Sequence, residues 1–290
     1  MIYVITGPTN TGKDSVAIEL AKCLGGEIVN ADAFHVYKQL KIGTNKPRDE
    51  DFLGIKHHLF EYVDVSEDYS IARYQSDARQ IIEDLIARNI PIILLGGSGL
   101  YIKAALYDYR FKDETPVDLS EYEKLNNAEL HTILRKVDAA SADRIHPHNR
   151  RRVLRALQIY FSQGNKKSDI PVLKDEAPIY EAQFFGVEFD RADLYLRIEK
   201  RVHRMMEEGL EDEAKSLLAR YGDKQQAFSA IGYKEMIEYI HGLISKEEAI
   251  SQIIANTRHY AKRQITFVRH QFPMQWIKSA ADIVANIKHG

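Results

Sequence analysis

Short apolar runs alternate along the chain with stretches in which apolar residues recur at helical spacing. Runs rich in branched and aromatic residues predict strands at residues 2–6, 27–30, 91–95 and 181–187. Helical periodicity predicts helices over 71–89, 193–221, 234–240 and 246–270, with an interruption near Gly209 in the second. The run at 91–95 is the most apolar and is typical of a central parallel strand. These patterns predict an α/β fold.

The remaining segments of this α/β part are less regular. Residues 56–62 and 274–277 predict short strands, and residues 33–47 predict a loop that contains a short helix. After Tyr109 the pattern changes, because residues 112–178 carry helical segments, including 121–138, with polar connections and no strong strand. We therefore predict an all-helical domain at 112–179, inserted into a core that residues 1–111 and 180–290 form.

The first strand leads directly into a glycine-bounded loop. Gly7-Pro8-Thr9-Asn10-Thr11-Gly12-Lys13 lies between that strand and a helical pattern that begins near Val16, which is the context of a Walker A phosphate loop. Backbone N–H groups, the helix N-terminus and Lys13 would form an anion site for a diphosphate or triphosphate. Such a spacing also occurs by chance, but the strand and helix around it favour the phosphate site. Where Ser or Thr normally holds Mg²⁺, this chain has Asp14.

Two further strand ends carry candidate chemistry. Asp32 follows the second strand, and residues at the carboxyl end of a strand in an open α/β sheet face the ligand crevice. The central strand ends in Gly96-Gly97-Ser98, where many P-loop enzymes have an Asp or Glu that holds Mg²⁺. This difference argues against a motor-type or switch-type ATPase.

Composition narrows the choice of protein class. The chain is 44% apolar and 28% charged, which is ordinary for a globular protein. We expect no membrane span, because no apolar run reaches eighteen residues. The first strand lacks a basic and apolar leader, so we expect no signal peptide and a cytoplasmic protein. The single cysteine, Cys23, excludes an internal disulfide, fits a reducing compartment, and is expected to be a small buried residue.

The net charge of −2 hides three basic clusters. One spans Arg150–Arg155, a second has Arg197, Arg201 and Arg204 on one helix face, and the third consists of Arg258, Lys262, Arg263 and Arg269. The first can be a solvated helix face, and the second can instead form ion pairs four residues apart with Asp193, Glu199 or Glu208. In a net-acidic chain they favour a focused channel for a polyanion. His57 and His58 are adjacent on a strand, so they point to opposite faces and predict a structural role rather than a metal site.

An ordered series of motifs along nearly the whole chain resembles the tRNA dimethylallyltransferases, also called tRNA isopentenyltransferases. The matching blocks are Gly7 to Lys13, Asn30 to Tyr37, Ile42 to Pro47, His57 to Leu59, Gly96 to Tyr101, Arg144 to Pro147, Arg155 to Leu157, Leu194 to Val202, Gly209-Leu210, Ile231 to Glu235, and Ala261 to Arg269. The resemblance implies a P-loop NTPase-like parallel sheet flanked by helices, with an inserted all-helical domain that contacts tRNA.

The resemblance also implies a reaction, in which a dimethylallyl group passes from dimethylallyl diphosphate to N6 of adenosine 37, beside the tRNA anticodon, with Mg²⁺. It implies catalytic roles for Asp32, Lys13 and Ser98. Asp32 would be the base, although a metal ligand or a loop cap are alternatives for it. The implied diphosphate contacts are Gly7, Thr9, Asn10, Thr11, Gly12, Lys13, Asp14 and Arg201, with Asp14 also the candidate metal ligand. The implied contacts to the anticodon stem-loop are Asp32, Ala33, Phe34, His35, Ser98, Arg151, Arg152, Arg155, Lys234, Lys262, Arg263, Gln264 and Arg269. We expect a monomer.

Several positions depart from the family's pattern. Asp14 replaces Ser or Thr, Ala33 stands where Ser is usual, and His35 stands where Gln is common. Ser98 replaces Thr but keeps a hydroxyl, and Ser229 occupies a place that is often basic. Because a carboxylate repels a diphosphate unless a cation lies between them, Asp14 either binds that metal or marks a slow or re-purposed paralogue. A small-molecule or nucleotide kinase of the P-loop class is the other alternative.

Overall fold

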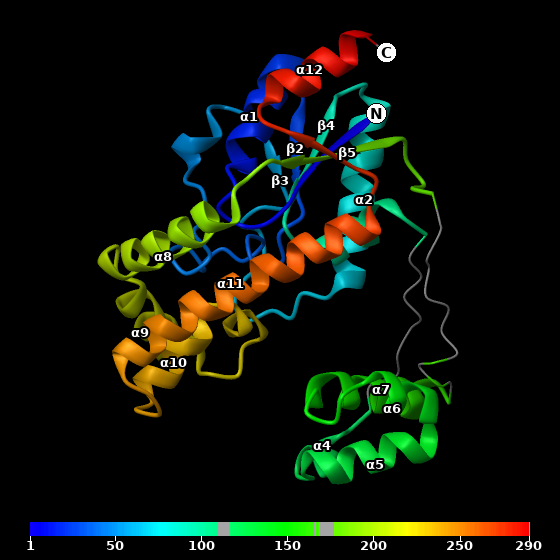
Figure 1. Ribbon diagram of the computed structural model, residues 1–290, viewed down its shortest axis with the longest axis vertical. Helices are drawn as coiled ribbons and strands as arrows, with labels where there is room; N and C mark the ends of the chain where they lie inside the picture. The colour runs from blue at the N-terminus through cyan, green and yellow to red at the C-terminus, as the bar shows by residue number, and fades with distance from the viewer. Residues whose placement is uncertain (109–116, 165, 167, 169–176, 290) are drawn as a thin grey trace. The chain divides into compact units, whose positions relative to one another are not determined.

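The computed structural model describes residues 1–108, 117–164, 166, 168 and 177–289 (Figure 1). The chain divides into two compact units, one made of Met1–Asp108 with Ala177–Gly290 and the other of Tyr109–Glu176. The predicted domain boundary between residues 111 and 112 lies outside the described residues. The other predicted boundary, between residues 179 and 180, falls within the first unit.

A six-stranded parallel sheet forms the centre of the first unit, in the order β3-β2-β4-β1-β5-β6. Its strands are β1 (Ile2–Thr6), β2 (Glu27–Asn30), β3 (His57–His58), β4 (Ile92–Gly96), β5 (Ala182–Val187) and β6 (Met274–Ile277). The predicted α/β class with a parallel, P-loop-like sheet flanked by helices is confirmed.

Strand β1 lies between β4 and β5 and is buried along its whole length. Its residues pair in register, with Val4 opposite Leu94 and Phe184, and Thr6 opposite Gly96 and Gly186. Because parallel strands end at one edge, this register brings the loops after β1 and β4 together there. The two glycine-rich loops of the sequence therefore meet.

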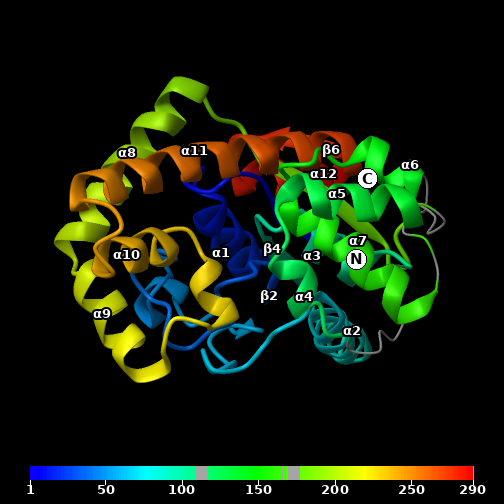
Figure 2. The same ribbon diagram turned by 90° about the horizontal axis from the view of Figure 1, so that it is seen from below.

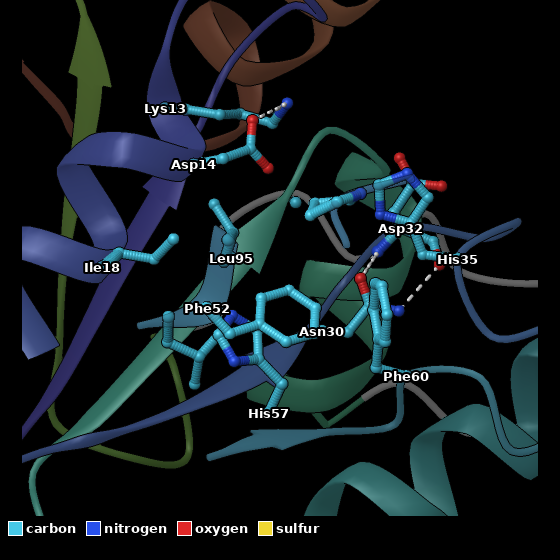
Figure 3. Close-up of a pocket in the computed structure, with 13 residues that line it drawn as sticks. Lys13, Asp14, Ile18, Asn30, Asp32, His35, Phe52, His57, Phe60 and Leu95 are labelled. Atoms are coloured by element: carbon cyan, nitrogen blue, oxygen red, sulfur yellow. Dashed lines mark hydrogen bonds and ion pairs between the residues drawn. The ribbon is translucent and has the colours of Figure 1, made fainter. Parts of the chain in front are cut away.

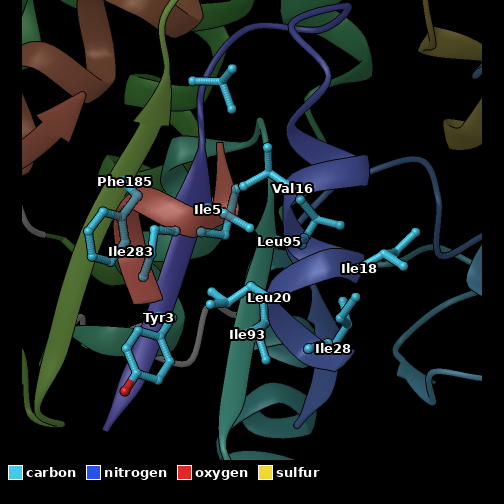
Figure 4. Packing of buried hydrophobic residues seen from close by; sticks show 14 of the residues in the cluster. Tyr3, Ile5, Val16, Ile18, Leu20, Ile28, Ile93, Leu95, Phe185 and Ile283 are labelled. Atoms are coloured by element: carbon cyan, nitrogen blue, oxygen red, sulfur yellow. The ribbon is translucent and has the colours of Figure 1, made fainter. Parts of the chain in front are cut away.

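Helices α1 (Lys13–Leu24) and α12 (Ala280–His289) pack on one face of the sheet. Their buried side chains, among them Val16, Leu20 and Ile283, form one core with Tyr3 and Ile5 of β1 (Figure 4). Helices α2 (Ile71–Ala87) and α3 (Gly99–Leu106) pack against each other and contact β4. Ser70 caps α2, accepting from the Arg73 N–H at 3.1 Å.

Four helices in the C-terminal part complete the first unit. They are α8 (Arg191–Glu207), α9 (Leu210–Tyr221), α10 (Tyr233–Ile240) and α11 (Lys246–Gln271). The predicted interruption at Gly209 is confirmed, since its φ of 100° is a left-handed conformation that favours glycine. Helices α8 and α11 lie side by side (Figure 1, Figure 2). In the described ranges, no helix is both long and apolar enough to cross a membrane.

Local chemistry explains where the predicted elements differ. Residues 33–47 form turns without a helix, and a short 3₁₀ helix, η1 (Asp49–Phe52), follows instead. The strand predicted over 56–62 shrinks to β3, because Leu59 and Glu61 have positive φ values of 57° and 50°. Helix α12 was not predicted. Cys23 is exposed rather than buried, since it lies outside the buried face of α1.

The described part of the second unit consists of helices and turns. Its helices are α4 (Ser120–Glu123), α5 (Asn127–Val137), α6 (Ala139–Arg144) and α7 (Arg150–Gln163), and they enclose a separate apolar core. The helix predicted over 121–138 is interrupted at Asn126, which caps α5 in a capping box with Glu129.

Candidate active site

The phosphate loop connects β1 to α1. Gly12 adopts φ 83° directly before α1, a left-handed conformation that turns the backbone into the helix. The Thr11 hydroxyl donates to the Pro8 carbonyl at 3.0 Å and closes the loop on itself. Two buried polar atoms here, Thr6 Oγ1 and Asn10 Nδ2, have no hydrogen-bond partner among the described residues. Buried polar groups are normally paired, so they fit a site that a polar ligand completes.

Arg201, predicted as a phosphate contact, reaches this loop from α8. Its Nη1 donates to Thr9 Oγ1 and, at 3.1 Å, to Asn10 Oδ1, while its Nη2 donates to the Thr44 carbonyl at 3.1 Å. Burial lowers the pKa of Arg201 to about 10, although the nearby carboxylates of Asp14 and Asp32 favour its charged form. At neutral pH it remains a cation beside the phosphate loop.

A pocket opens between the phosphate loop and the end of β2 (Figure 3). Its polar lining consists of Lys13, Asp14, Asn30, Asp32 and His35. The rest of its lining is mainly apolar and aromatic: Ile18, Ile28, Pro47, Phe52, His57, Phe60, Leu95 and Gly96. The expectation that Asp32 faces the phosphate loop is confirmed, because Asp32 and Lys13 line the same pocket.

The two aspartates of the pocket are held ionised. Burial opposes the charge of Asp32, but nearby His35, the N–H of Phe34 at 3.0 Å and Lys13 outweigh it and lower its pKa. Burial also opposes the charge of Asp14, whose pKa is lowered by Lys13, His35 and Arg201. The nearest charges of Lys13 and Asp14 are 3.6 Å apart. The side chain of Asp14 is 40% exposed, so solvent screens part of these interactions.

Ser98 lies at the end of β4, against the loop after β2. Its Oγ accepts from the Ala33 N–H at 3.1 Å, and its own N–H donates to the Ala31 carbonyl at 3.2 Å. Tyr260 of α11, which our sequence reasoning missed, lies beside it. Burial and the charge of Asp32 raise the pKa of Tyr260 to about 12, partly offset by hydrogen bonding with Ser98. The only sequence signal for Tyr260 was its position next to the Ala261–Arg269 block.

Gln264, which we predicted as a tRNA contact, is buried in the structure. Its Oε1 accepts from the Thr9 N–H at 3.1 Å, and its Nε2 donates to the Gly97 carbonyl at 2.9 Å. A Cβ on Gly97 would lie 2.0 Å from that Nε2, so any larger residue there would displace the Gln264 amide. The amide of Gln264 therefore joins the phosphate loop to the end of β4, and it has little surface left for a nucleic acid.

The other predicted tRNA contacts lie on both units. Lys234, Lys262, Arg263 and Arg269 are exposed on α10 and α11, and Arg151, Arg152 and Arg155 are exposed on α7 of the second unit. Ala33, Phe34 and His35 are partly buried beside Asp32.

Two arginines of the basic clusters have structural partners. Arg150 differs from its neighbours, because its guanidinium donates to the carbonyls of Leu125 and Glu123, at 2.6 and 2.5 Å. Arg258 pairs with Glu199 at 2.8 Å, which fits a structural role.

The two adjacent histidines serve different structural contacts. His57 stacks on Phe52 with ring centroids 3.8 Å apart, and burial lowers its pKa. His58 lies 2.5 Å from a Glu27 carboxylate oxygen. Among the described residues, no group of three or more His, Cys, Asp or Glu is arranged to hold a metal ion.

Known proteins resemble this chain over nearly its full length. It is 41% identical over 285 residues to the tRNA dimethylallyltransferase of Anoxybacillus flavithermus, covering 98% of this chain and 92% of that one. It is 44% identical over 282 residues to the enzyme of the same name from Geobacillus thermodenitrificans, covering 95% and 89%.

Solved structures agree with these relatives. The tRNA delta(2)-isopentenylpyrophosphate transferase of Staphylococcus epidermidis is 35% identical, with a TM-score of 0.74 over 100% of this chain and 99% of that one. A eukaryotic dimethylallyltransferase acting on tRNA is 28% identical, with a TM-score of 0.78 over 99% and 76%. A family model described as IPP transferase matches residues 35–271. With a phosphate loop, a facing aspartate and this likeness across its length, the chain belongs to the IPP transferase family.

Proposed function

We propose that the chain transfers a dimethylallyl group from dimethylallyl diphosphate to N6 of adenosine 37 in tRNA, releasing diphosphate. The observation that carries the proposal is the pocket, which combines a phosphate-loop lysine, an ionised aspartate and an apolar wall. The relatives' name, tRNA dimethylallyltransferase, supports the same reaction.

The phosphate loop would stabilise the leaving group. When the bond between C1 of the prenyl group and its oxygen breaks, the electron pair stays on diphosphate and an allylic cation develops. Lys13, Arg201 and the N–H groups of residues 7–12 would hold the negative charge of the diphosphate. Because Arg201 is fixed by Thr9, Asn10 and Thr44, it needs little reorganisation when charge develops.

The apolar part of the pocket suits the five-carbon group. Ile18, Phe52 and Phe60 would shield it from water, which would otherwise capture the allylic cation. Aromatic faces such as that of Phe60 also stabilise nearby positive charge. The rings of Phe52 and Phe60 pack edge to face, with their centroids 4.9 Å apart, so this part of the pocket wall is closely packed.

Asp32 would take the proton from the attacking amine. As the bond between N6 and C1 forms, N6 gives up one proton, and the Asp32 carboxylate accepts it. The low pKa of Asp32 keeps it ionised at neutral pH, ready to accept. Ser98 and Tyr260 border the same position and would hydrogen-bond the adenine or its sugar. The base must leave its stack to reach them, which costs less for a loop nucleotide than for a paired one.

Mg²⁺ is the proposed metal. Asp14 offers a hard oxygen ligand beside Lys13 of the phosphate loop, and Mg²⁺ typically uses one or two carboxylates together with phosphate oxygens and water. The residues present therefore fit Mg²⁺, with Asp14 its ligand. When bound, the metal would neutralise charge on the diphosphate.

The exposed basic residues would hold the anticodon stem-loop by its phosphates. Those on α10 and α11 belong to the unit that carries the pocket, and those on α7 belong to the helical unit. We also propose that the enzyme acts as a monomer in the cytoplasm.

The test is a transfer assay with purified protein, unmodified tRNA, dimethylallyl diphosphate and Mg²⁺, followed by nucleoside mass spectrometry. We expect N6-dimethylallyladenosine, mapped to position 37 by fragment analysis, and none in tRNA with guanosine 37. Absence of prenylated adenosine under every divalent-metal condition would overturn the proposal. Salt-dependent tRNA binding without product would then indicate a tRNA-binding paralogue, and ATP consumption with a nucleotide acceptor would indicate a kinase.

A further inference from the structure

We propose that Glu213 and Tyr233 are positioning residues for the diphosphate site, acting through residues 42–44 on Arg201. Neither would touch a substrate. The inference rests on the proposed function only for the identity of the anion, since the contacts themselves belong to the described structure. It gives a role to Tyr233, in the Ile231–Glu235 block, for which sequence reasoning had assigned only Lys234.

Glu213 of α9 binds the backbone of a turn that is far away in the sequence. Its carboxylate accepts from the Ile42 N–H at 3.0 and 3.1 Å and from the Gly43 N–H at 3.4 Å. A carboxylate that accepts backbone N–H bonds makes charge-assisted hydrogen bonds, which are stronger than neutral ones. Glu213 therefore fixes the start of the 42–45 turn against α9.

Tyr233, at the start of α10, closes the same contact. It is fully buried, its hydroxyl donates to Glu213, and it accepts from the Gly43 N–H at 3.2 Å. A Cβ on Gly43 would lie 2.3 Å from the Tyr233 ring, so the turn approaches the ring as closely as glycine permits. The position of the turn is thus determined on two sides, by a carboxylate and by an aromatic face.

The next residue of the turn connects to the phosphate loop. The Thr44 carbonyl accepts from Arg201 Nη2 at 3.1 Å and lies 3.3 Å from His35 Nε2. The other terminal nitrogen of Arg201 bonds Thr9 and Asn10 of the loop. A shift of the turn would therefore withdraw one of the contacts that orient the guanidinium, and small misplacements of such groups are costly.

The experiment uses the full chain and inorganic pyrophosphate as the probe, without tRNA. Glu213→Gln and Tyr233→Phe are compared with Glu211→Gln, a control on the same helix whose carboxylate pairs with Lys215 and Lys246 instead. By calorimetry we expect each test variant to weaken pyrophosphate binding about 10-fold, in line with the loss of one buried hydrogen bond. We expect the control to stay within about 2-fold, and tRNA affinity by filter binding to be unchanged in all three.

A double-mutant cycle separates positioning from a general loss of stability. If Glu213 acts through Arg201, its replacement in an Arg201→Lys background should weaken pyrophosphate binding by less than about 2-fold, because coupled residues are not additive. If Glu213→Gln still weakened pyrophosphate binding about 10-fold in that background, or if tRNA affinity fell in parallel, the inference would be overturned. Tyr233→Phe keeps the buried ring and serves if Glu213→Gln does not fold. Pyrophosphate binding does not require prenyl transfer, so failure of the proposed function would leave this cycle intact.

Discussion

Asp32 is the residue on which the proposed chemistry depends most. Replacing it with Ala removes the proton acceptor and leaves the phosphate loop and the basic surfaces in place. We expect the transfer rate at saturating substrates to fall about 10²- to 10⁴-fold, the usual contribution of a general base. The tRNA affinity should change by less than about 3-fold, since one carboxylate contributes little to phosphate recognition. Single-turnover kinetics and filter binding measure the two quantities.

The pKa of Asp32 adds a pH test. Because it is below its ordinary value, Asp32 stays ionised between pH 8 and 5, and its protonation should not slow transfer in that range. The control for Asp32→Ala is Asp49→Ala, which changes an exposed aspartate on η1 and should keep the wild-type transfer rate. Equal losses of transfer and tRNA binding in Asp32→Ala would show that Asp32 shapes the binding loop and is not the base.

Asp14 tests whether the unusual carboxylate serves the metal. In Asp14→Thr a neutral ligand replaces a charged one, so we expect the Mg²⁺ concentration for half-maximal transfer to rise about 10-fold. Transfer at saturating Mg²⁺ should change little. Calorimetric titration of Mn²⁺ into the pyrophosphate complex should show the same weakening without any turnover.

Glu19→Gln, an exposed change on the same helix, is the control for Asp14. If Asp14→Thr instead strengthened pyrophosphate binding and left the Mg²⁺ dependence unchanged, Asp14 would act only by repulsion. That result would make the departure from the family pattern a disadvantage without compensation.

Among the elements, strands were easier to predict than their limits. β1 and β4 are buried on both sides, and a continuous apolar run signals that burial directly. The limits of elements depend on single residues. β3 ends where Leu59 adopts a positive φ, and α5 begins where Asn126 caps it. Asp32 and Lys13 could be placed because strand ends fix them.

The residues that support the site could not be placed from the sequence. Gln264 and Tyr260 both come from α11. Gln264 contacts Thr9, 255 positions before it, and Tyr260 bonds Ser98, about 160 positions before it, while Glu213 binds a turn about 170 positions before it. No local pattern distinguishes a buried Gln that joins two loops from an exposed Gln. Their roles depend on helix packing, which becomes visible only in the folded chain.

Helix α6 provides a prediction at the level of an element. Asp138 caps it, accepting from the N–H groups of Ser141 and Ser168, both at 2.9 Å. Burial opposes its charge, but these hydrogen bonds lower its pKa to about 2. We expect Asp138→Ala to lower the exchange protection of the amides at 139–145 about 3- to 30-fold at pH 6, the range expected for a lost cap.

The pH dependence of this cap has a definite sign. The pKa of Asp138 is lower in the folded chain than its unfolded value of about 3.9. The ionised carboxylate therefore stabilises the helix at pH values above 3.9, and this stabilisation is lost as the pH falls toward 2. The difference in protection between wild type and variant should therefore narrow between pH 5 and pH 2. Asp143→Ala, on the same helix with an exposed ion pair to Arg135, should have little effect. A pH-independent difference would mean that lost packing, not the charge, explains the change.

For the whole molecule, the distribution of charge matters more than its sum. A net charge of −2 would disfavour a polyanion if it were spread evenly. The exposed arginines of α7 and the exposed cations of α10 and α11 instead gather positive charge on two separate units. If both units hold the same tRNA, the helical unit should contribute affinity without taking part in the chemistry.

Replacing Arg151, Arg152 and Arg155 together with Gln tests this division. Each phosphate contact contributes about 0.7–0.9 to the slope of log affinity against log salt, so we expect the slope to fall by about 2 to 3. The KM for tRNA should rise at least about 10-fold, while the rate at saturating tRNA and the pyrophosphate affinity stay within about 2-fold of wild type. Arg135→Gln is the control, because Asp143 already neutralises Arg135 at 2.9 Å. An unchanged salt slope would mean that the α7 arginines are a solvated helix face, and tRNA recognition would then rest on the unit that carries the pocket.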